Sequence, residues 1–321
     1  MRIREVLGKM LLPAILGAVA LTSLGLLGDI EDVFISLRNF QWGYLPIIVV
    51  FGFGNDMIKF LRWDYYLKRL GIELSRKESL SVFIAGLAFS ATPGKIGFIM
   101  KNIFLKKMTD KPIIDTSPVV FAELYTDFIT LSLIALAGFM YIGIDTKHLI
   151  LISSLSCLFL AIAMIKSVPL FCIQIAGKLP VLKNRTQSLK QAVEAMYDIM
   201  SPFSLLYATV ISLLAWTSEG VALWFILKGL GASLTLVLST IVFSIATLLG
   251  AVTMLPGGLI VTEGSLLGLL SKLGIHKAPA ASATLLARLC TLWLAVLVGT
   301  AVLLYAWRTF NGKGERAING N

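Results

Sequence analysis

Several stretches of this chain are apolar for about the length of a membrane-spanning helix, and this constrains the fold more than any motif does. A helix needs roughly 20 apolar residues to cross about 30 Å of hydrocarbon. Hydrophobic residues make up 57% of the 321 positions and charged residues 14%, which is too little polar surface to cover a soluble globule. A transmembrane barrel would show alternating segments of about ten residues. The sequence predicts an all-α, polytopic membrane helical bundle in a single membrane domain, residues 1–321.

Six segments are predicted to span the membrane. They cover residues 8–27, 44–62, 117–143, 147–168, 202–228 and 279–306. The first follows a basic start and contains the small-residue triplet Ala18-Val19-Ala20, as a signal peptide does. Because its apolar run continues to Leu27, we favour an uncleaved signal anchor over a cleaved signal peptide.

Two further apolar stretches are each interrupted by a Pro-Gly turn. Residues 79–106 are broken at Pro93-Gly94, and residues 234–272 are broken at Pro256-Gly257-Gly258. Proline has no backbone N–H and glycine permits unusual backbone angles, so both turns expose peptide groups that need partners in a dry medium. We predict two re-entrant hairpins.

The distribution of basic residues predicts that these hairpins enter from opposite sides. The net charge is +10, and if each hairpin enters and leaves on one side, most of the 28 Lys and Arg residues, Arg62 among them, lie in the cytoplasm. Both termini are then cytoplasmic, and residues 44–143 and 202–306 form two inverted repeats. Interrupted segments at corresponding places in such repeats point to a transporter site at their interface. The alternative is two coincidental turns in a plain helical bundle.

The segment between the repeats, residues 166–200, is basic and partly amphipathic. This pattern predicts a helix on the cytoplasmic leaflet of a prokaryotic inner membrane, attracted by anionic lipid, although a solvated linker fits equally well. The positive charge is better explained by topology and headgroups than by nucleic acid, which we do not expect as a partner.

Ionisable residues within the apolar segments are the candidate site. A charge at the centre of a spanning helix costs about 2.5 to 3.5 kcal/mol, so it normally pairs or lines a wet cavity. Basic residues at the first turn could bind phosphate oxygens of a ligand. The alternatives are that Arg288 pairs with Glu219, Glu263 or Glu123 only to lock the bundle, and that Lys95 extends to the interface. The predicted substrate-binding residues are Pro93, Gly94, Lys95, Lys101, Glu123, Asp127, Glu219, Pro256, Gly257, Gly258, Glu263 and Arg288, with Asn55 and Asp56 as secondary candidates.

Patterns typical of enzymes are mostly missing. His148 and His276 lie near predicted helix ends, and the chain has no HExxH motif or nucleophile elbow. Its three cysteines have no CxxC spacing. Glu123 and Asp127 share one helix face and could in principle serve acid/base chemistry or a divalent metal. We expect no metal site, no cofactor and no enzymatic activity.

Three groups of residues together resemble a known family. They are the turn Thr92-Pro93-Gly94-Lys95 with Lys101, the acidic face from Glu123 to Asp127, and Leu255-Pro256-Gly257-Gly258-Leu259 with Glu263-Gly264 and the distal Arg288. This pattern resembles the transmembrane family found in lysylphosphatidylglycerol synthases and in stand-alone flippase-like proteins, over nearly the whole chain. The resemblance implies a flippase that moves an anionic phospholipid or a polyprenyl-phosphate-linked intermediate between leaflets. A membrane-embedded lipid-modifying transferase, or an accessory subunit of one, is the alternative.

Two positions depart from the family pattern. Leu124 stands where an Arg often follows the helix Glu, and Ile260 stands where a Gly is more usual. Both departures concern the charge pairing rather than the inverted architecture. The aminoacyl-transferase domain of the fused proteins has no counterpart in this sequence, so we do not expect lysyl transfer.

Overall fold

The computed structural model describes residues 30–92, 96–142, 165–176 and 185–318, which are helical apart from turns and short connections. In chain order the elements are α2 (Ile30–Arg38), η1 (Trp42–Tyr44), α3 (Leu45–Arg69), α4 (Arg76–Leu87), α5 (Ile96–Thr109), α6 (Ile113–Ile142), α8 (Ser167–Ala176), α10 (Thr186–Ile199), α11 (Pro202–Gly229), α12 (Leu236–Val252), η3 (Pro256–Gly258), α13 (Val261–Lys272), α14 (Lys277–Arg288), η4 (Leu289–Trp293) and α15 (Leu294–Ile318). The long helices α3 and α11 each have a proline in their first turn, and they end at Arg69 and Gly229.

Within the described residues, four helical segments are long and apolar enough to cross a membrane. They are Trp42–Arg69, Ile113–Tyr141, Pro202–Gly229 and Lys277–Trp307. The predicted all-α polytopic membrane fold is thus confirmed, and these segments correspond to four of the six predicted spans. The predicted spans 8–27 and, for the most part, 147–168 lie outside the described residues.

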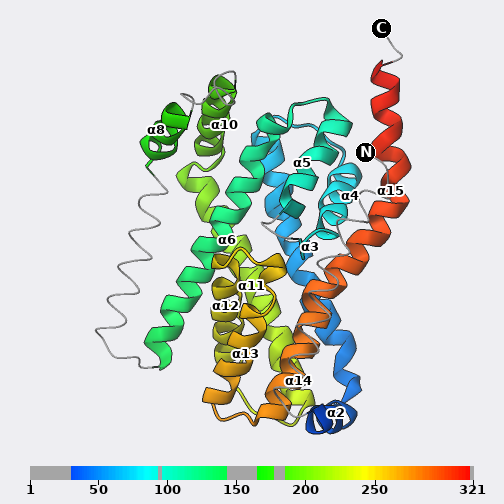
Figure 1. Ribbon diagram of the computed structural model, residues 1–321, viewed down its shortest axis with the longest axis vertical. Coiled ribbons are helices and arrows are strands. Elements are labelled where there is room, and N and C mark those ends of the chain that lie inside the picture. Colours follow the sequence, from blue (N-terminus) through cyan, green and yellow to red (C-terminus); the bar gives the residue numbers. More distant parts are fainter. Residues whose placement is uncertain (1–29, 93–95, 143–164, 177–184, 319–321) are drawn as a thin grey trace.

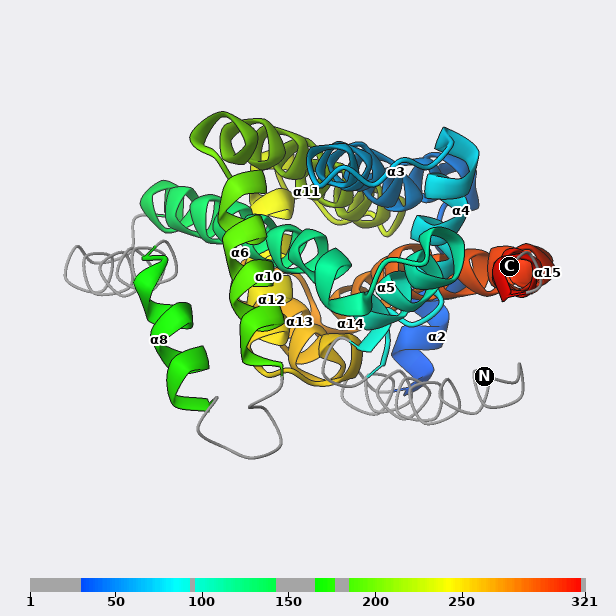
Figure 2. The same cartoon turned by 90° about the horizontal axis from the view of Figure 1, so that it is seen from above.

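The two long helices α3 and α11 pack against each other and run in opposite directions (Figure 1). Figure 2, seen from above, shows them side by side along one edge of the bundle. In Figure 1, α4 and α5 lie toward one end of the long axis, whereas α12 and α13 lie toward the other. The two interrupted stretches therefore occupy opposite ends of the molecule.

The turns that follow α3 and α11 have the same structure. Gly71 and Gly231 take positive φ angles, +65° and +71°, which a residue without a side chain adopts without steric cost. The next N–H groups, of Ile72 and Ala232, each donate to a carbonyl five residues earlier in the last helical turn. This is the Schellman arrangement of a helix end.

The helices that follow these turns also begin alike. The Ser75 hydroxyl accepts a hydrogen bond from the third residue of α4, and the Thr235 hydroxyl does the same at α12. Corresponding residues are 160 positions apart, and Asn55 of α3 donates to the carbonyl of Ala215, its own counterpart on α11. The α3–α4 and α11–α12 units are thus equivalent in local structure.

Each half packs its second helix against the last span of the other half. α4 lies on α15, and α12 lies on α6. Glycines permit both contacts, because a Cβ at Gly299 would overlap the backbone of Ala88 and a Cβ at Gly138 would overlap the Ile241 side chain. The halves therefore interlock. Their inverted orientation in the membrane and the re-entrant character of the hairpins stay predictions.

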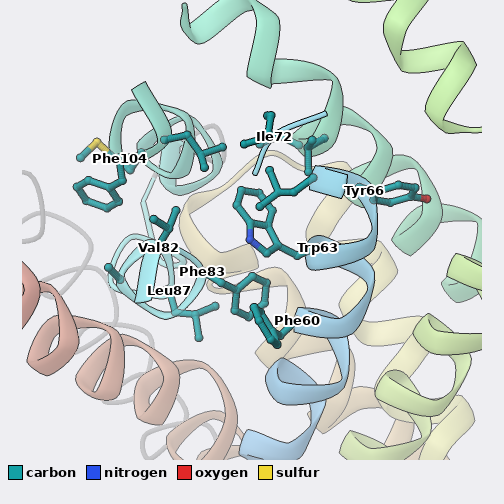
Figure 3. Packing of buried hydrophobic residues seen from close by; sticks show 14 of the residues in the cluster. Phe60, Trp63, Tyr66, Ile72, Val82, Phe83, Leu87 and Phe104 are labelled. Atoms are coloured by element: carbon teal, nitrogen blue, oxygen red, sulfur yellow. The ribbon is translucent and has the colours of Figure 1, made fainter. Parts of the chain in front are cut away.

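Each hairpin has its own hydrophobic core. In the first half, Trp63 of α3 points toward Phe83 of α4, with Phe104 of α5 in the same cluster (Figure 3). Tyr66 points to the opposite side of α3 and bonds Thr126 of α6. The second core gathers side chains of α11, α12, α13 and α14 around Leu223. Because interiors pack to near-crystalline density, each core fixes its hairpin to the long helix beside it.

The predicted connector between the halves is helical where it is described. α10 packs against α6 and α8, and Arg69 at the end of α3 donates to the backbone carbonyl of Asp198 at 3.3 Å. Residues 177–184, which include two of its basic residues, lie outside the described part of the chain. Placement of this connector on the membrane surface stays a prediction.

Replacing Gly299 with Ala tests the close crossing of α15 and α4. The added methyl group overlaps backbone atoms that cannot rotate away, so we expect a loss of about 1 to 3 kcal/mol, seen as a lower thermal unfolding midpoint in detergent. Gly268→Ala is the matched control, because no atom lies within 4 Å of its Cβ position. An unchanged midpoint for Gly299→Ala would contradict the crossing.

Candidate functional site

The second Pro-Gly turn reaches the chain segment that leads into the first. A Cβ placed on Gly257 would lie 3.2 Å from the Cα of Ala91, which directly precedes Thr92. The interruptions of the two apolar stretches therefore approach each other inside the bundle. Predicted site residues Pro93, Gly94 and Lys95 lie outside the described residues.

The second turn is held in a strained backbone conformation. Gly257 and Gly258 have φ angles of +57° and +66°. Ile260, which precedes α13, has φ +74° and ψ −54°, a conformation that is rare and costly for a β-branched residue. A glycine at this position would remove the strain. Strain of this kind persists only where the surrounding contacts impose it.

Arg288 supplies such contacts. Its Nε donates to Glu263 Oε1 at 2.6 Å, and its Nη2 donates to the Gly257 carbonyl at 2.6 Å. Both charged side chains are buried. Of the three carboxylates considered as partners, Glu263 is the one that forms the ion pair. Among the described residues, the other carboxylate oxygen, Glu263 Oε2, is buried without a hydrogen-bond partner.

Lys101 and Glu123 form the corresponding ion pair of the first half. Lys101 Nζ lies 3.1 Å and 3.3 Å from the two Glu123 oxygens, and both residues are buried. The ammonium also lies 4.7 Å from the Trp63 ring centre and 4.2 Å from that of Phe83, within cation–π range. Gly86 makes room for it, because a Cβ there would lie 2.5 Å from Lys101 Cγ.

The two pairs occupy equivalent places with opposite sign. In the first half the cation is on α5 and the carboxylate on α6, whereas in the second half the carboxylate is on α13 and the cation on α14. Aligning the halves on their turn prolines brings the paired residues within two positions of each other. Each hairpin is therefore tied to the following span by one buried ion pair.

A third pair, between Arg62 and Asp127, corrects the sequence prediction for Arg62. Arg62 was assigned to the cytoplasmic side, but α3 continues to Arg69 and its guanidinium is buried within the bundle. Arg62 Nη1 donates to Asp127 Oδ1 at 2.8 Å and to the Ser212 hydroxyl. Trp216 Nε1 donates to the same Asp127 oxygen at 3.2 Å. The sequence does contain a pattern that indicates this position: one face of the apolar helix carries polar residues at 55, 59, 62 and 66.

Between these pairs lie three half-buried charged residues. Asp56 and Lys59 are on α3, and Glu219 is on α11. Lys59 Nζ lies 3.5 Å from the centre of the Trp216 ring, and its charge acts on both carboxylates. Asn55 has a structural role, because its amide bonds the Ala215 carbonyl.

The interior charges form one connected series, which we call the charge ladder. The charge of Glu123 acts on both Lys101 and Arg62, and the charges of Lys59 and Arg288 both act on Glu219. The series extends from the first hairpin through α3, α6 and α11 to the second hairpin. Its members are Lys101, Glu123, Arg62, Asp127, Asp56, Lys59, Glu219, Arg288 and Glu263. Within the described residues, no three His, Cys, Asp or Glu side chains group as a metal site would require.

Comparison with known proteins agrees with the resemblance found in the sequence. A family model described as the lysylphosphatidylglycerol synthase transmembrane region matches residues 11–299. A UPF0104 membrane protein from Methanothermobacter thermautotrophicus is 25% identical over 320 residues, covering 91% of this chain and 94% of the relative. A UPF0104 membrane protein from Pyrococcus horikoshii is 24% identical over 272 residues, covering 76% and 81%. The family match includes both hairpins and every member of the charge ladder.

The strained turn leads to a stability prediction. Ile260→Gly should raise the thermal unfolding midpoint by the equivalent of about 1 kcal/mol, because relief of left-handed strain exceeds the entropy cost of glycine. Val252→Gly removes an equally exposed side chain from the end of α12 and should lower the midpoint. A lower midpoint for Ile260→Gly would show that the turn is not strained.

Proposed function

The chain belongs to the lysylphosphatidylglycerol synthase transmembrane family, and from this premise we propose that it moves an anionic lipid between the two leaflets of a membrane. The cargo would be a phospholipid or a polyprenyl-phosphate-linked intermediate. This proposal assigns the protein to the cytoplasmic membrane of a prokaryote, with both termini in the cytoplasm.

The charge ladder is the observation that carries this proposal. A phosphate group cannot cross hydrocarbon bare, because an unpaired charge there costs several kcal/mol. In the ladder, Lys101 and Arg288 are each paired with a carboxylate. A phosphate that takes the place of such a carboxylate keeps the cation paired, so the cation is not left as a bare charge while the headgroup passes.

The residues then have distinct roles. Lys101 and Arg288, with Lys95, attract the headgroup phosphate. Glu123, Asp127, Glu219 and Glu263 pair the cations between substrates, or carry protons if transport is coupled to them. The turn at Pro256, Gly257 and Gly258 positions Arg288 through the Gly257 carbonyl.

A transport assay with alanine variants tests these roles. Protein reconstituted into vesicles that contain headgroup-labelled phosphatidylglycerol should exchange the label between leaflets, and Lys101→Ala and Arg288→Ala should each slow the exchange at least tenfold. Lys68→Ala, which removes an exposed cation at the end of α3, should leave it unchanged. Normal exchange in both ladder variants, together with a covalently altered lipid, would favour the transferase alternative.

A charge swap separates substrate binding from a structural lock. The double variant Lys101→Glu/Glu123→Lys keeps an ion pair between α5 and α6 but moves the cation to the other helix. We expect its thermal midpoint to return toward that of the unmodified protein while exchange stays low. Full recovery of exchange would mean that the pair serves only to lock the bundle.

A further inference from the structure

Glu123 interacts with two cations that come from different helices. Lys101 on α5 contacts both of its carboxylate oxygens, and its negative charge also acts on the guanidinium of Arg62 on α3. Lys101 and Arg62 in turn act on each other as like charges. Without the carboxylate, two buried cations would face each other in a medium of low dielectric constant.

Two residues that interact with the Lys101–Glu123 pair have buried hydrogen-bond donors that are not used. Arg62 bonds through Nη1, whereas its Nε is buried with no partner in the described part of the chain. The indole Nε1 of Trp63 is likewise buried without a partner. Figure 3 shows this nitrogen on the side of the indole that faces Phe83, and the rings of Trp63 and Phe83 both contact the Lys101 ammonium. Buried donors without acceptors are rare in native proteins and call for an explanation.

We propose that Glu123 occupies the place of the substrate's phosphate, between Lys101 and Arg62, and that a phosphodiester takes this position when the Glu123 carboxylate withdraws. Trp63 Nε1 and Arg62 Nε supply the donors that a phosphate, with more acceptor oxygens than a carboxylate, satisfies. This inference rests on the proposed function and assigns its central binding site to Arg62 as well as Lys101.

Charge balance narrows the class of substrate. Asp56 also acts on Lys101, but Lys59 balances Asp56. With the Glu123 carboxylate withdrawn, Lys101, Arg62 and Asp127 therefore leave one net positive charge. A phosphodiester carries one negative charge and restores neutrality, just as the carboxylate does. A pyrophosphate linkage carries at least one more negative charge, which would be left without a partner in a buried site. The site therefore selects a phosphodiester headgroup.

The second hairpin provides a natural contrast. Glu263 pairs with Arg288, which is also bound to the Gly257 carbonyl and is acted on by Glu219. Neutralising Glu263 leaves one cation, Arg288, on which the charge of Glu219 acts, whereas neutralising Glu123 leaves two cations, Lys101 and Arg62, that repel each other. Loss of the Glu123 charge should therefore raise the anion affinity of the site at Lys101 and Arg62. Loss of the Glu263 charge should not raise the anion affinity of the site at Arg288.

Binding of a small phosphodiester to Glu123→Gln tests the inference. Titration of the purified full-length variant with dimethyl phosphate, followed by calorimetry and by tryptophan fluorescence, should give an affinity at least tenfold higher than that of the unmodified protein. Glu263→Gln should change the affinity for dimethyl phosphate less than threefold. The double variant Glu123→Gln/Arg62→Lys keeps the positive charge at position 62 but removes Nε and the paired N–H donors of the guanidinium. It should therefore lose most of the increase in dimethyl phosphate affinity.

Three further probes separate the sources of the phosphate. Phosphatidylglycerol in mixed micelles should compete with dimethyl phosphate on Glu123→Gln, and pyrophosphate should bind more weakly than the diester. The inference is overturned if Glu123→Gln gains no affinity for dimethyl phosphate, or if Glu263→Gln gains as much. It is also overturned if inorganic phosphate binds better than the diester, because the ligand would then be a free phosphate ion. If the unmodified protein exchanges lipid but Glu123→Gln shows no increase in dimethyl phosphate affinity, only the inference about the binding site is wrong. If the affinity increases but the unmodified protein exchanges no lipid, only the proposed function is wrong.

Discussion

The ion pair between Arg62 and Asp127 joins the three helices on which the rest of the bundle depends. Arg62 comes from α3, Asp127 comes from α6, and Ser212 and Trp216 of α11 complete the hydrogen bonds around them. Removing one partner of such a buried pair leaves a bare charge and typically costs about 3 to 5 kcal/mol. The pair therefore holds α3, α6 and α11 in one arrangement, to which the two hairpins attach at opposite ends of the molecule (Figure 1).

The attachment of the hairpins follows the same electrostatic requirement. Each is held to the following span by one buried ion pair, and the sign of the charges is reversed between the halves. Together with the Arg62–Asp127 pair, these give the interior charges of both signs rather than a field of one sign. Under the proposed function, an anion entering from either end meets a cation whose present partner is a carboxylate.

Much of this fold could be predicted from sequence, because apolar length and Pro-Gly interruptions are local signals. The four described spans follow from apolar length. The pairing of Arg288 with a carboxylate was one alternative for a charge inside an apolar segment. Arg62 was misplaced because the apolar run ends near residue 62 although the helix continues to Arg69. Which carboxylate each cation selects could not be predicted, because Glu123, Glu219 and Glu263 are equivalent in sequence and differ only in tertiary position.

The account depends most on the two halves having opposite orientations in the membrane. Glu73 and Ser233 are exposed, equivalent residues in the matching turns after α3 and α11. Single cysteines at these two positions, in a chain without Cys157, Cys172 and Cys290, can be labelled in intact cells with a membrane-impermeant maleimide. We predict that the cysteine at 233 is labelled from outside and that the one at 73 reacts only after the membrane is opened. Labelling of both from the same side would contradict the inverted arrangement.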